Sequence, residues 1–325
     1  MNIGKLNWDD LEQIINRYKS VKRDEVIIRN GIGEDCSVID FGEEECVLST
    51  DPITGTTKNM GKLAVHINCN DIASCGVEPL GIMVTILAPP NVELDDISSI
   101  MKEIDEETQK LNIEILGGHT EITDAVNRMV VSCTVIGKGK RGKAVATSGA
   151  KDGDDIIVTK DLALEGTGII INEYKEKLQN ILGEEELLEG RTYIEHISVV
   201  KEGIICGNFG VNSMHDITEG GVLGALWEMA EASELGFKVY ESIMPITNLT
   251  KKICNTLNID ALRLISSGSM LITTNRGKEL VELLKNNGIK ATIIGKITDS
   301  KGILVSNHEE VEVMPPKRDE LFNIK

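Results

Sequence analysis

Basic residues are scarce in this sequence. Its 325 residues include 34 Lys and Arg against 52 Asp and Glu, which gives a formal net charge of -18. Non-specific binding to DNA, RNA or anionic lipid depends on clustered Lys and Arg side chains. The shortage argues against nucleic acid or a membrane surface as a partner. It also means that a bound polyphosphate would need Mg2+ and backbone N–H groups to offset charge repulsion.

Long hydrophobic runs are missing as well. The longest, Leu80 to Ala88, ends at Pro89 and Pro90 and falls well short of the ~20 apolar residues that span a bilayer. The seven cysteines are an odd number without a C-x-x-C pair, and Met1 to Asp10 carries no signal-peptide pattern. We therefore expect no transmembrane segment, reduced thiols and a cytoplasmic protein.

Several familiar site motifs are absent or incomplete. No HExxH or Cys–His pattern supports zinc, and the alternating elements lack Rossmann glycines. The run from Gly137 to Ala144 nearly spells a P-loop, but Ala144 lacks the hydroxyl that would hold Mg2+. We interpret this run as a basic interdomain turn, with contact to phosphate as the alternative.

Length and composition predict two globular domains. A chain of this length exceeds the usual single core, and 41% hydrophobic with 26% charged residues is ordinary for a folded protein. Lys138 to Lys151 is rich in Lys, Gly, Ala and Ser and has little periodicity, so we place the boundary there. The sequence predicts an α/β (α+β) fold with domains 1–145 and 146–325.

Hydrophobic periodicity locates the elements. Asn7 is a candidate cap for the first helix, and the strands at 36–41 and 46–50 are spaced as a hairpin. We expect helices at 8–18, 61–75, 93–111, 168–178, 197–209, 219–233, 249–257 and 276–287. We expect strands at 26–28, 36–41, 46–50, 80–87, 113–121, 128–136, 155–159, 211–214, 237–240, 269–273, 291–297 and 303–305.

Acidic residues mark the ends of several elements in the first half. Gly33, Glu34 and Asp35 form a turn before a strand, where small residues let the backbone approach a ligand. Asp51 follows another strand and precedes Pro52. Asp35 reads equally well as a turn acid and Asp51 as a strand terminator, but together they indicate a site for a metal-bound polyphosphate.

The predicted helix 61–75 carries an unusual polar cluster. Asn68, Asn70 and Asp71 have poor helix propensity in mid-helix, which favours a compensating use. Asn68 and Asp71 are three residues apart and share a face. This polar stripe is a candidate part of the site.

Two further motifs carry candidate site residues. Gly117 and Gly118 can expose backbone amides at a strand end, with His119 or Glu121 placed for proton transfer; a surface turn is the alternative. Asp216 follows a strand and precedes Thr218, Glu219 and two glycines at a helix start that would attract phosphate. A plain capping box explains that segment equally well.

Taken together, the motifs resemble the aminoimidazole-ribonucleotide synthetase-related superfamily, which includes that purine enzyme, thiamine-monophosphate kinase, selenophosphate synthetase and the hydrogenase maturation factor HypE. The resemblance covers about Gly31 to Gly295. It rests on Gly33–Val38, Ser49–Asp51, Asn70–Ala73 with Gly76 and Pro79, Gly117–Glu121, Lys160 with Leu164–Thr167, His215–Gly221 and Ser267–Leu271. The segments His215–Gly221 and Leu164–Thr167 look most like HypE.

The resemblance implies both a fold and a ligand. It implies an N-terminal ATP-binding domain that forms a barrel-like sheet with a second copy, a C-terminal α/β sandwich, and hence a homodimer. Asp35, Asp51, Asp71 and Asp216 match the acids that hold Mg2+ on ATP phosphates. The residues assigned to ATP contact are Gly33, Glu34, Asn68, Asn70, Gly117, Gly118 and Lys160; His119 and Glu121 are assigned to catalysis.

The resemblance leaves the reaction open. HypE proteins end in a cysteine that carries a carbamoyl group, whereas this sequence ends Phe322–Lys325. We therefore expect a Mg2+-dependent, ATP-using enzyme that activates an amide-like or carbamoyl oxygen by phosphoryl transfer onto a different acceptor. A non-catalytic dimeric nucleotide-binding partner in a maturation or regulatory complex is the alternative, and aminoimidazole-ribonucleotide synthesis is a minor one.

Overall fold

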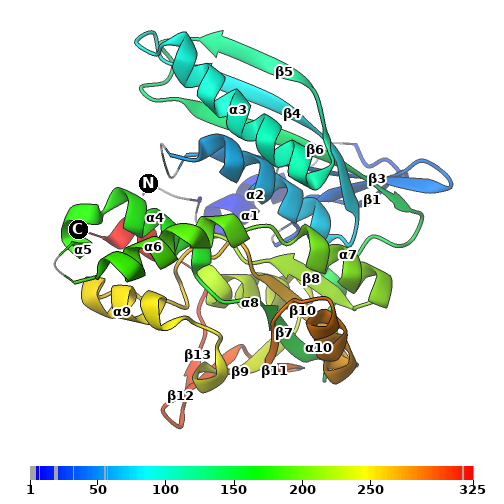
Figure 1. Ribbon diagram of the computed structural model, residues 1–325. Coiled ribbons are helices and arrows are strands. Elements are labelled where there is room, and N and C mark those ends of the chain that lie inside the picture. The colour runs from blue at the N-terminus through cyan, green and yellow to red at the C-terminus, as the bar shows by residue number, and fades with distance from the viewer. Residues whose placement is uncertain are drawn as a thin grey trace.

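The chain folds into two α/β domains that stack on each other (Figure 1). The structure is a computed structural model that describes residues 5–6, 8–17, 21–31, 33–54, 56, 58–179, 181–316 and 318–324. The expected cap at Asn7 lies outside these residues. In Figure 1 the N-terminal domain forms the upper part and the C-terminal domain the lower part.

The element bounds follow the chain order. The helices are α1 (Trp8–Arg17), α2 (Met60–Ser74), α3 (Leu94–Leu111), α4 (Leu164–Glu173), α5 (Lys175–Leu178), α6 (Glu184–Thr192), α7 (Val200–Phe209), α8 (Gly221–Ala232), α9 (Asn248–Leu257) and α10 (Gly277–Asn286). The strands are β1 (Val26–Ile28), β2 (Ser37–Asp40), β3 (Glu44–Ile53), β4 (Glu78–Ala88), β5 (Glu114–Ile122), β6 (Val130–Lys140), β7 (Asp155–Thr159), β8 (Ser213–Asp216), β9 (Gly236–Tyr240), β10 (Met270–Thr274), β11 (Ala291–Thr298), β12 (Ile303–Ser306) and β13 (Glu309–Glu312).

The N-terminal domain is a six-stranded sheet covered on one face. The strand order is β1-β2-β3-β6-β4-β5, and only the β4–β5 pair is parallel. Helix α2 packs on β3 and β6, and α3 packs on α2 (Figure 1). Exposed apolar side chains remain on β4 and β5, namely Leu80, Met83, Leu116 and Ile122. These side chains leave apolar surface exposed on this part of the sheet.

The C-terminal domain is a seven-stranded mixed sheet between helices. Its order is β13-β12-β9-β11-β7-β10-β8. Residues of α8 pack with Ile156 and Leu271 on one face, whereas residues of α7 and α10 pack with Ile157 and Ile272 on the other. Neighbouring strand residues alternate between the two faces, so both faces of the sheet need apolar side chains. The expected α/β sandwich is confirmed.

Helix α2 joins the two domains at the centre of the molecule. It contacts the first sheet on one side and α7 of the C-terminal domain on another, and nearly all of its residues are buried. The close approach of α7 depends on Gly203, because a Cβ there would lie 2.2 Å from the carbonyl oxygen of Ala73. Asn68, Asn70 and Asp71 of α2 are therefore buried near the contact between the two domains.

Most elements lie within a few residues of their predicted positions, including the β2–β3 hairpin. Strand β6 continues to Lys140, so Lys138 and Lys140 belong to a strand rather than to a basic turn. Gly117 and Gly118 lie in the middle of β5, not at its end. One predicted helix is two, α4 and α5, and the sequence patterns missed α6 and β13. The predicted boundary at 145/146 lies between β6 and β7.

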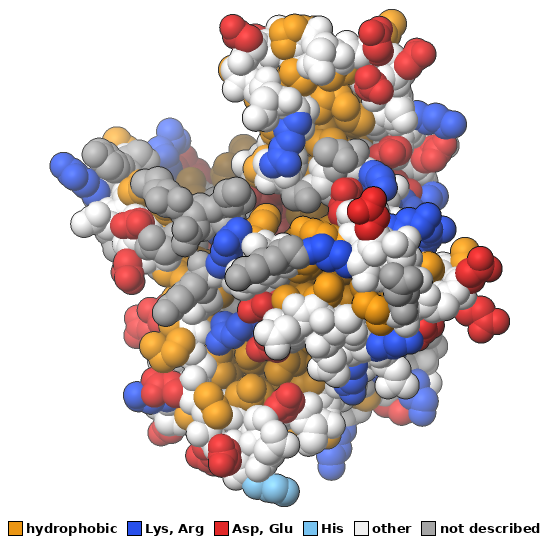
Figure 2. Space-filling model, turned by 90° about the vertical axis from the view of Figure 1, so that its left-hand side faces the viewer, with side chains coloured by type: hydrophobic (Ala, Val, Ile, Leu, Met, Phe, Trp, Pro, Cys, Tyr) orange, Lys and Arg blue, Asp and Glu red, His pale blue; other side chains and the backbone are white. Residues whose placement is uncertain are grey.

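The surface agrees with the composition. On the face in Figure 2, acidic and basic side chains both occur, and apolar side chains are visible over both domains. No helix in the described part of the chain combines the length and hydropathy needed to cross a bilayer. All seven cysteines are free.

Candidate functional site

A cavity of about 580 Å³ lies where the two domains meet. The N-terminal segment, the β2–β3 region and α2 form one side, and β8 with α8 forms the other. All four acids predicted to hold Mg2+ line this cavity. The described lining residues are Lys5, Trp8, Leu11, Asn30, Gly31, Gly33, Glu34, Asp35, Cys36, Ser37, Leu48, Ser49, Thr50, Asp51, Asp71, Thr134, His215, Asp216, Thr218 and Glu228.

Each of the four acids reaches the cavity on a different element. Asp35 stands just before β2, Asp51 lies in β3, Asp71 in α2, and Asp216 is the last residue of β8. Three come from the N-terminal domain, and Asp216 comes from a strand at the edge of the C-terminal sheet. The site therefore exists only when the two domains are joined.

Gly33 allows the turn before Asp35 to approach α8. Its φ is +77°, a left-handed conformation that glycine adopts without strain. A Cβ at this position would lie 2.8 Å from the carbonyl oxygen of Glu228. Glycine at position 33 is therefore required for both the turn and the contact between domains.

His215 connects two buried carboxylates across the domain interface. Its Nδ1 lies 2.7 Å from Asp35 Oδ1, and its Nε2 lies 2.7 Å from Glu228 Oε2. Burial lowers the pKa of an imidazole, but Asp35 and Glu228 outweigh that effect and hold the pKa of His215 well above its ordinary value. We therefore treat His215 as an imidazolium that fixes Asp35.

Asp71 and Asp216 are buried and the Asp35 side chain is 10% exposed, whereas Asp51 is exposed at the rim. Asp71 is 5% exposed and accepts a hydrogen bond from the Ser49 hydroxyl. Burial, with Asp216, Asp51 and Asp35 nearby, raises the pKa of Asp71 well above its ordinary value. Burial and the charge of Asp35 raise the pKa of Asp216 to about 8. Such mutual repulsion is relieved by a cation among the carboxylates.

Two carboxylate oxygens in this group lack partners. Asp35 Oδ2 and Asp216 Oδ2 are buried without a hydrogen bond from any described group. One ligand atom each from Asp35, His215 and Asp216 lie within 4.8 Å of one another. Both nitrogens of His215 already face carboxylates, so the oxygens that remain available in this group belong to Asp35 and Asp216. Carboxylate oxygens are the ligands that Mg2+ prefers, and the residues present fit this ion.

Glu34 lines the cavity, but its carboxylate is used within the protein. Its two oxygens accept hydrogen bonds from the backbone nitrogens of Thr147 and Ser148, both at 3.1 Å. These donors begin the 3-10 turn Thr147–Gly149 between the two sheets. The contact ties the Gly33–Asp35 turn to the interdomain segment.

Asn68 and Asn70 are buried in α2 and do not line the cavity among its described residues. Asn68 accepts a hydrogen bond from the backbone nitrogen of Asp51 at 2.8 Å, which holds β3 against the helix. Asn70 donates to the Ile197 carbonyl and accepts from the Val199 nitrogen, both at 2.8 Å. The contacts give Asn68 a positioning role and make Asn70 a bridge between the domains.

The remaining predicted site residues lie away from this cavity. His119 and Glu121 are exposed on edge strand β5, with 3.4 Å between His119 Nε2 and Glu121 Oε2. Gly118 lets β5 approach β4, because a Cβ there would overlap the carbonyl oxygen of Val84; Gly117 is exposed beside it. Lys160 pairs with Glu202 at 2.7 Å. A single chain does not bring these residues to the acids.

Two residues of the site escaped the sequence reasoning. Glu228 lies within the apolar sequence of α8, and a lone glutamate at a buried helix position was the available signal. Lys5 lines the cavity from the N-terminal segment, and no motif in that segment singles it out.

Family models match most of the chain. The N-terminal domain of AIR synthase related protein matches residues 33–138, and the C-terminal domain of the same family matches residues 151–306. A Methanocaldococcus jannaschii protein named for hydrogenase expression and formation is 30% identical over 292 residues, which cover 86% of this chain and 85% of that protein. Carbamoyl dehydratase HypE of Bradyrhizobium diazoefficiens is 25% identical over 246 residues, which cover 74% of this chain and 69% of that protein.

Solved structures share the fold. A HypE–HypF complex gives a TM-score of 0.71 at 23% identity, covering 88% of this chain and 94% of that chain. A structure of hydrogenase maturation protein HypE in complex with ATP gives a TM-score of 0.70 at 17% identity. The match covers 90% of this chain and 92% of that chain. With both domain models matched in order over a fold of this kind, the chain belongs to the AIR synthase related proteins.

Proposed function

We propose that this protein is a Mg2+-dependent enzyme that uses ATP to phosphorylate the oxygen of an amide-like or carbamoyl substrate. The observation that carries the proposal is the convergence of four acids from separate elements on one cavity, with unpartnered oxygens on Asp35 and Asp216. The ATP assignment is supported by a HypE structure of the same fold, which was solved in complex with ATP. The carbamoyl assignment draws on the relative named carbamoyl dehydratase.

Each acid has a defined task in this proposal. Asp35, Asp51, Asp71 and Asp216 would hold Mg2+, which supplies positive charge to the phosphate oxygens when it is bound. His215 keeps Asp35 in place, and Ser49 does the same for Asp71. The turn at Gly33 and Glu34 forms the wall beside them. Transfer of the terminal phosphoryl group to the substrate oxygen would turn that oxygen into a leaving group.

The open face of the first sheet supports the proposed homodimer. Leu80 and Ile122 are each 54% exposed, and Met83 and Leu116 are nearly as exposed. A second copy covering these side chains would remove apolar surface from water. His119 and Glu121 lie on the same edge strand, so they can serve as proton-transfer groups only if dimer formation brings them to a partner's cavity. Gly117 and Gly118 would reach a nucleotide by the same route.

Calorimetric titration with the non-hydrolysable analogue AMPPNP, with and without Mg2+, tests the nucleotide site. We expect binding that requires Mg2+ and is lost in Asp71→Asn, since this variant removes a ligand charge with little change in volume. Asp124→Asn, at an exposed position outside the cavity, is the matched control. Mg2+-dependent binding that survives in Asp71→Asn would contradict the proposed site.

A second candidate function is a non-catalytic, nucleotide-binding partner in a maturation complex. The exposed position of His119 and Glu121 favours it, because the described cavity then lacks the groups assigned to proton transfer. The HypE–HypF complex is consistent with such a partner protein. ATP turnover that rises with an added carbamoyl compound would separate the enzyme from this alternative. Turnover that stays at background while binding is intact would favour the partner role.

A further inference from the structure

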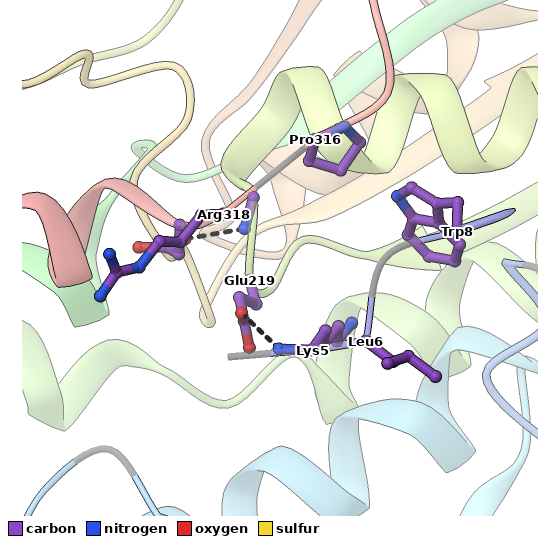
Figure 3. A pocket seen from close by; sticks show the side chains of 8 residues that line it. Lys5, Leu6, Trp8, Glu219, Pro316 and Arg318 are labelled. Carbon is purple, nitrogen blue, oxygen red and sulfur yellow. Dashed lines mark hydrogen bonds between the residues drawn. The ribbon is translucent and has the colours of Figure 1, made fainter. Parts of the chain in front are cut away.

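The C-terminal segment of the chain packs against the start of helix α8. Pro316 and Arg318 line a small hollow at that helix start (Figure 3). A Cβ added at Gly220 would lie 3.1 Å from Pro316 Cβ, so the segment lies close to the turn before the helix. Leu321, 5% exposed, is buried in a cluster with residues of α4 and α9. The segment is therefore held at both of these places in the C-terminal domain.

Asp319 of this segment bonds the backbone at the start of α8. The residue is 1% exposed, and its Oδ2 accepts a hydrogen bond from the Gly220 nitrogen at 2.7 Å, a dashed line in Figure 3. Gly220 is the N-cap residue of α8 and has no side chain of its own to satisfy the free N–H groups there. Asp319 Oδ1 accepts from the Leu321 nitrogen at 2.8 Å, which fixes the carboxylate from its other side. A carboxylate at this end of a helix is also favoured by the helix dipole.

The turn that Asp319 contacts carries part of the proposed nucleotide site. It connects Asp216, the last residue of β8, with Gly220. Thr218 lies between them and lines the cavity, and its hydroxyl has no hydrogen bond to a described residue. A hydroxyl can donate a hydrogen bond to a phosphate oxygen. The position of this turn therefore decides where the Thr218 hydroxyl lies relative to the acids.

Three hydrogen bonds from described residues tie this turn to the rest of the C-terminal domain. The Ile217 nitrogen donates to the Ser269 carbonyl at 3.0 Å. The Thr218 carbonyl accepts from the Ser266 nitrogen at 3.3 Å. These two backbone contacts hold the first half of the turn, whereas the Asp319 carboxylate holds the end next to α8. Of the three contacts, the one from Asp319 is made by a side chain, so a substitution can remove it.

We propose that Asp319 is a positioning residue of the nucleotide site, which holds the turn before α8 so that Thr218 faces the phosphates of the bound nucleotide. The inference rests on the proposed ATP-using function. Residues that orient the groups around a metal are needed for full affinity, and their substitution commonly costs about 10–100-fold. The alternative is that Asp319 only fastens the C-terminal segment. Its loss would then lower the free energy of unfolding and leave nucleotide affinity unchanged.

Titration of the full-length protein with AMPPNP and Mg2+ separates these roles. We expect Asp319→Ala to weaken AMPPNP binding about tenfold. Asp319→Asn keeps one acceptor oxygen, so it should weaken binding by a smaller factor, and it carries the test if the alanine variant does not fold. Glu309→Ala removes an equal charge from an exposed position outside the cavity and should bind like wild type. Wild-type affinity in both Asp319 variants would overturn the inference.

A double-mutant cycle tests whether Asp319 acts through Thr218. Thr218→Val removes the hydroxyl and keeps the shape of the side chain. If the two residues act together, Asp319→Ala should weaken AMPPNP binding by a much smaller factor in the Thr218→Val background than in wild type. Hydrogen exchange of the Gly220 amide should also become faster in Asp319→Ala, since this amide loses its acceptor.

The outcomes distinguish the inference from the proposed function. Equal factors in the two backgrounds would show that Asp319 does not act through Thr218 and would overturn the inference. Unchanged exchange of the Gly220 amide would overturn it as well, because the turn would then not depend on Asp319. Either result leaves the nucleotide site in place. Absence of Mg2+-dependent AMPPNP binding by wild type would instead overturn the proposed function.

Discussion

His215 Nδ1 lies 2.7 Å from Asp35 Oδ1, and this ion pair joins strand β8 of the C-terminal domain to the turn that opens β2 in the N-terminal domain. The His215 and Asp35 side chains are 5% and 10% exposed. The pair leaves Asp35 Oδ2 without a partner. One oxygen of the carboxylate thus fixes the domain interface while the other remains available in the cavity.

His215→Ala should destabilise the protein strongly. The substitution leaves Asp35 and Glu228 buried without their shared cation, and removal of one partner from a buried pair costs about 3–5 kcal/mol. Urea unfolding of the metal-free protein measures the loss. His196→Ala, at an exposed position, is the control. Equal unfolding midpoints for the two variants would contradict the assigned role of His215.

Local patterns marked Asp35, Asp51, Asp71 and Asp216 only as candidates, and the family resemblance joined them into one set, which the structure places around one cavity. The sequence also predicted most elements in their order, since hydrophobic periodicity is a local property, but it missed α6 and β13. It did not predict the separate contacts of Asn68 and Asn70, which differ by only two positions, yet one contacts β3 and the other the C-terminal domain. Such choices depend on how α2 is enclosed.

Contacts between residues far apart in the sequence explain why the positions of other residues were not predicted. Glu228 and Lys5 enter the cavity because α8 and the N-terminal segment pack against residues far from them in sequence. The placement of His119 and Glu121 follows from β5 taking the edge of the sheet beside β4. No local pattern around position 119 distinguishes an edge strand from one that ends at the site, so that assignment stays a prediction that depends on the dimer.

The metal-free protein should lose stability as the pH rises from 6 to 9. Burial and Asp35 raise the pKa of Asp216 to about 8 in the folded state, so the stabilisation present with a protonated Asp216 is lost as pH rises through that value. The raised pKa of His215 acts in the same direction, because stability falls as the imidazolium loses its proton. Mg2+ should reduce the loss, since it can replace the protons between the acids.

Thermal melting across this pH range in the presence of a chelator measures the effect. Asp216→Asn removes one titrating group. We therefore expect the melting temperature of this variant to change by about 5 °C less than that of wild type between pH 6 and 9. Asp152→Asn, at an exposed position in the loop before β7, should follow wild type. Parallel curves for Asp216→Asn and wild type would show that Asp216 does not titrate in this range.

The double variant His119→Gln and Glu121→Gln should separate binding from chemistry. Neither residue lines the cavity of its own chain, so Mg2+-dependent AMPPNP affinity should remain near wild type. If dimer formation brings the pair to a substrate, turnover of ATP with a carbamoyl compound should fall about 100-fold, the usual contribution of a positioned acid or base. Unchanged turnover would remove these residues from catalysis.

Gly33→Ala should impair the site more than an equally strained substitution elsewhere. Both Gly33 and Gly42 have positive φ, +77° and +99°, so alanine at either position costs about 1–2 kcal/mol of backbone strain. A Cβ at Gly42 meets nothing within 4 Å, whereas one at Gly33 lies 2.8 Å from the Glu228 carbonyl oxygen and must displace the turn or α8. In urea unfolding, we expect both variants to lose a similar part of their free energy of unfolding through backbone strain. Only Gly33→Ala should lose more than this and also bind AMPPNP with Mg2+ more weakly. Equal effects of the two substitutions on AMPPNP affinity would mean that the contact between Gly33 and Glu228 does not shape the cavity.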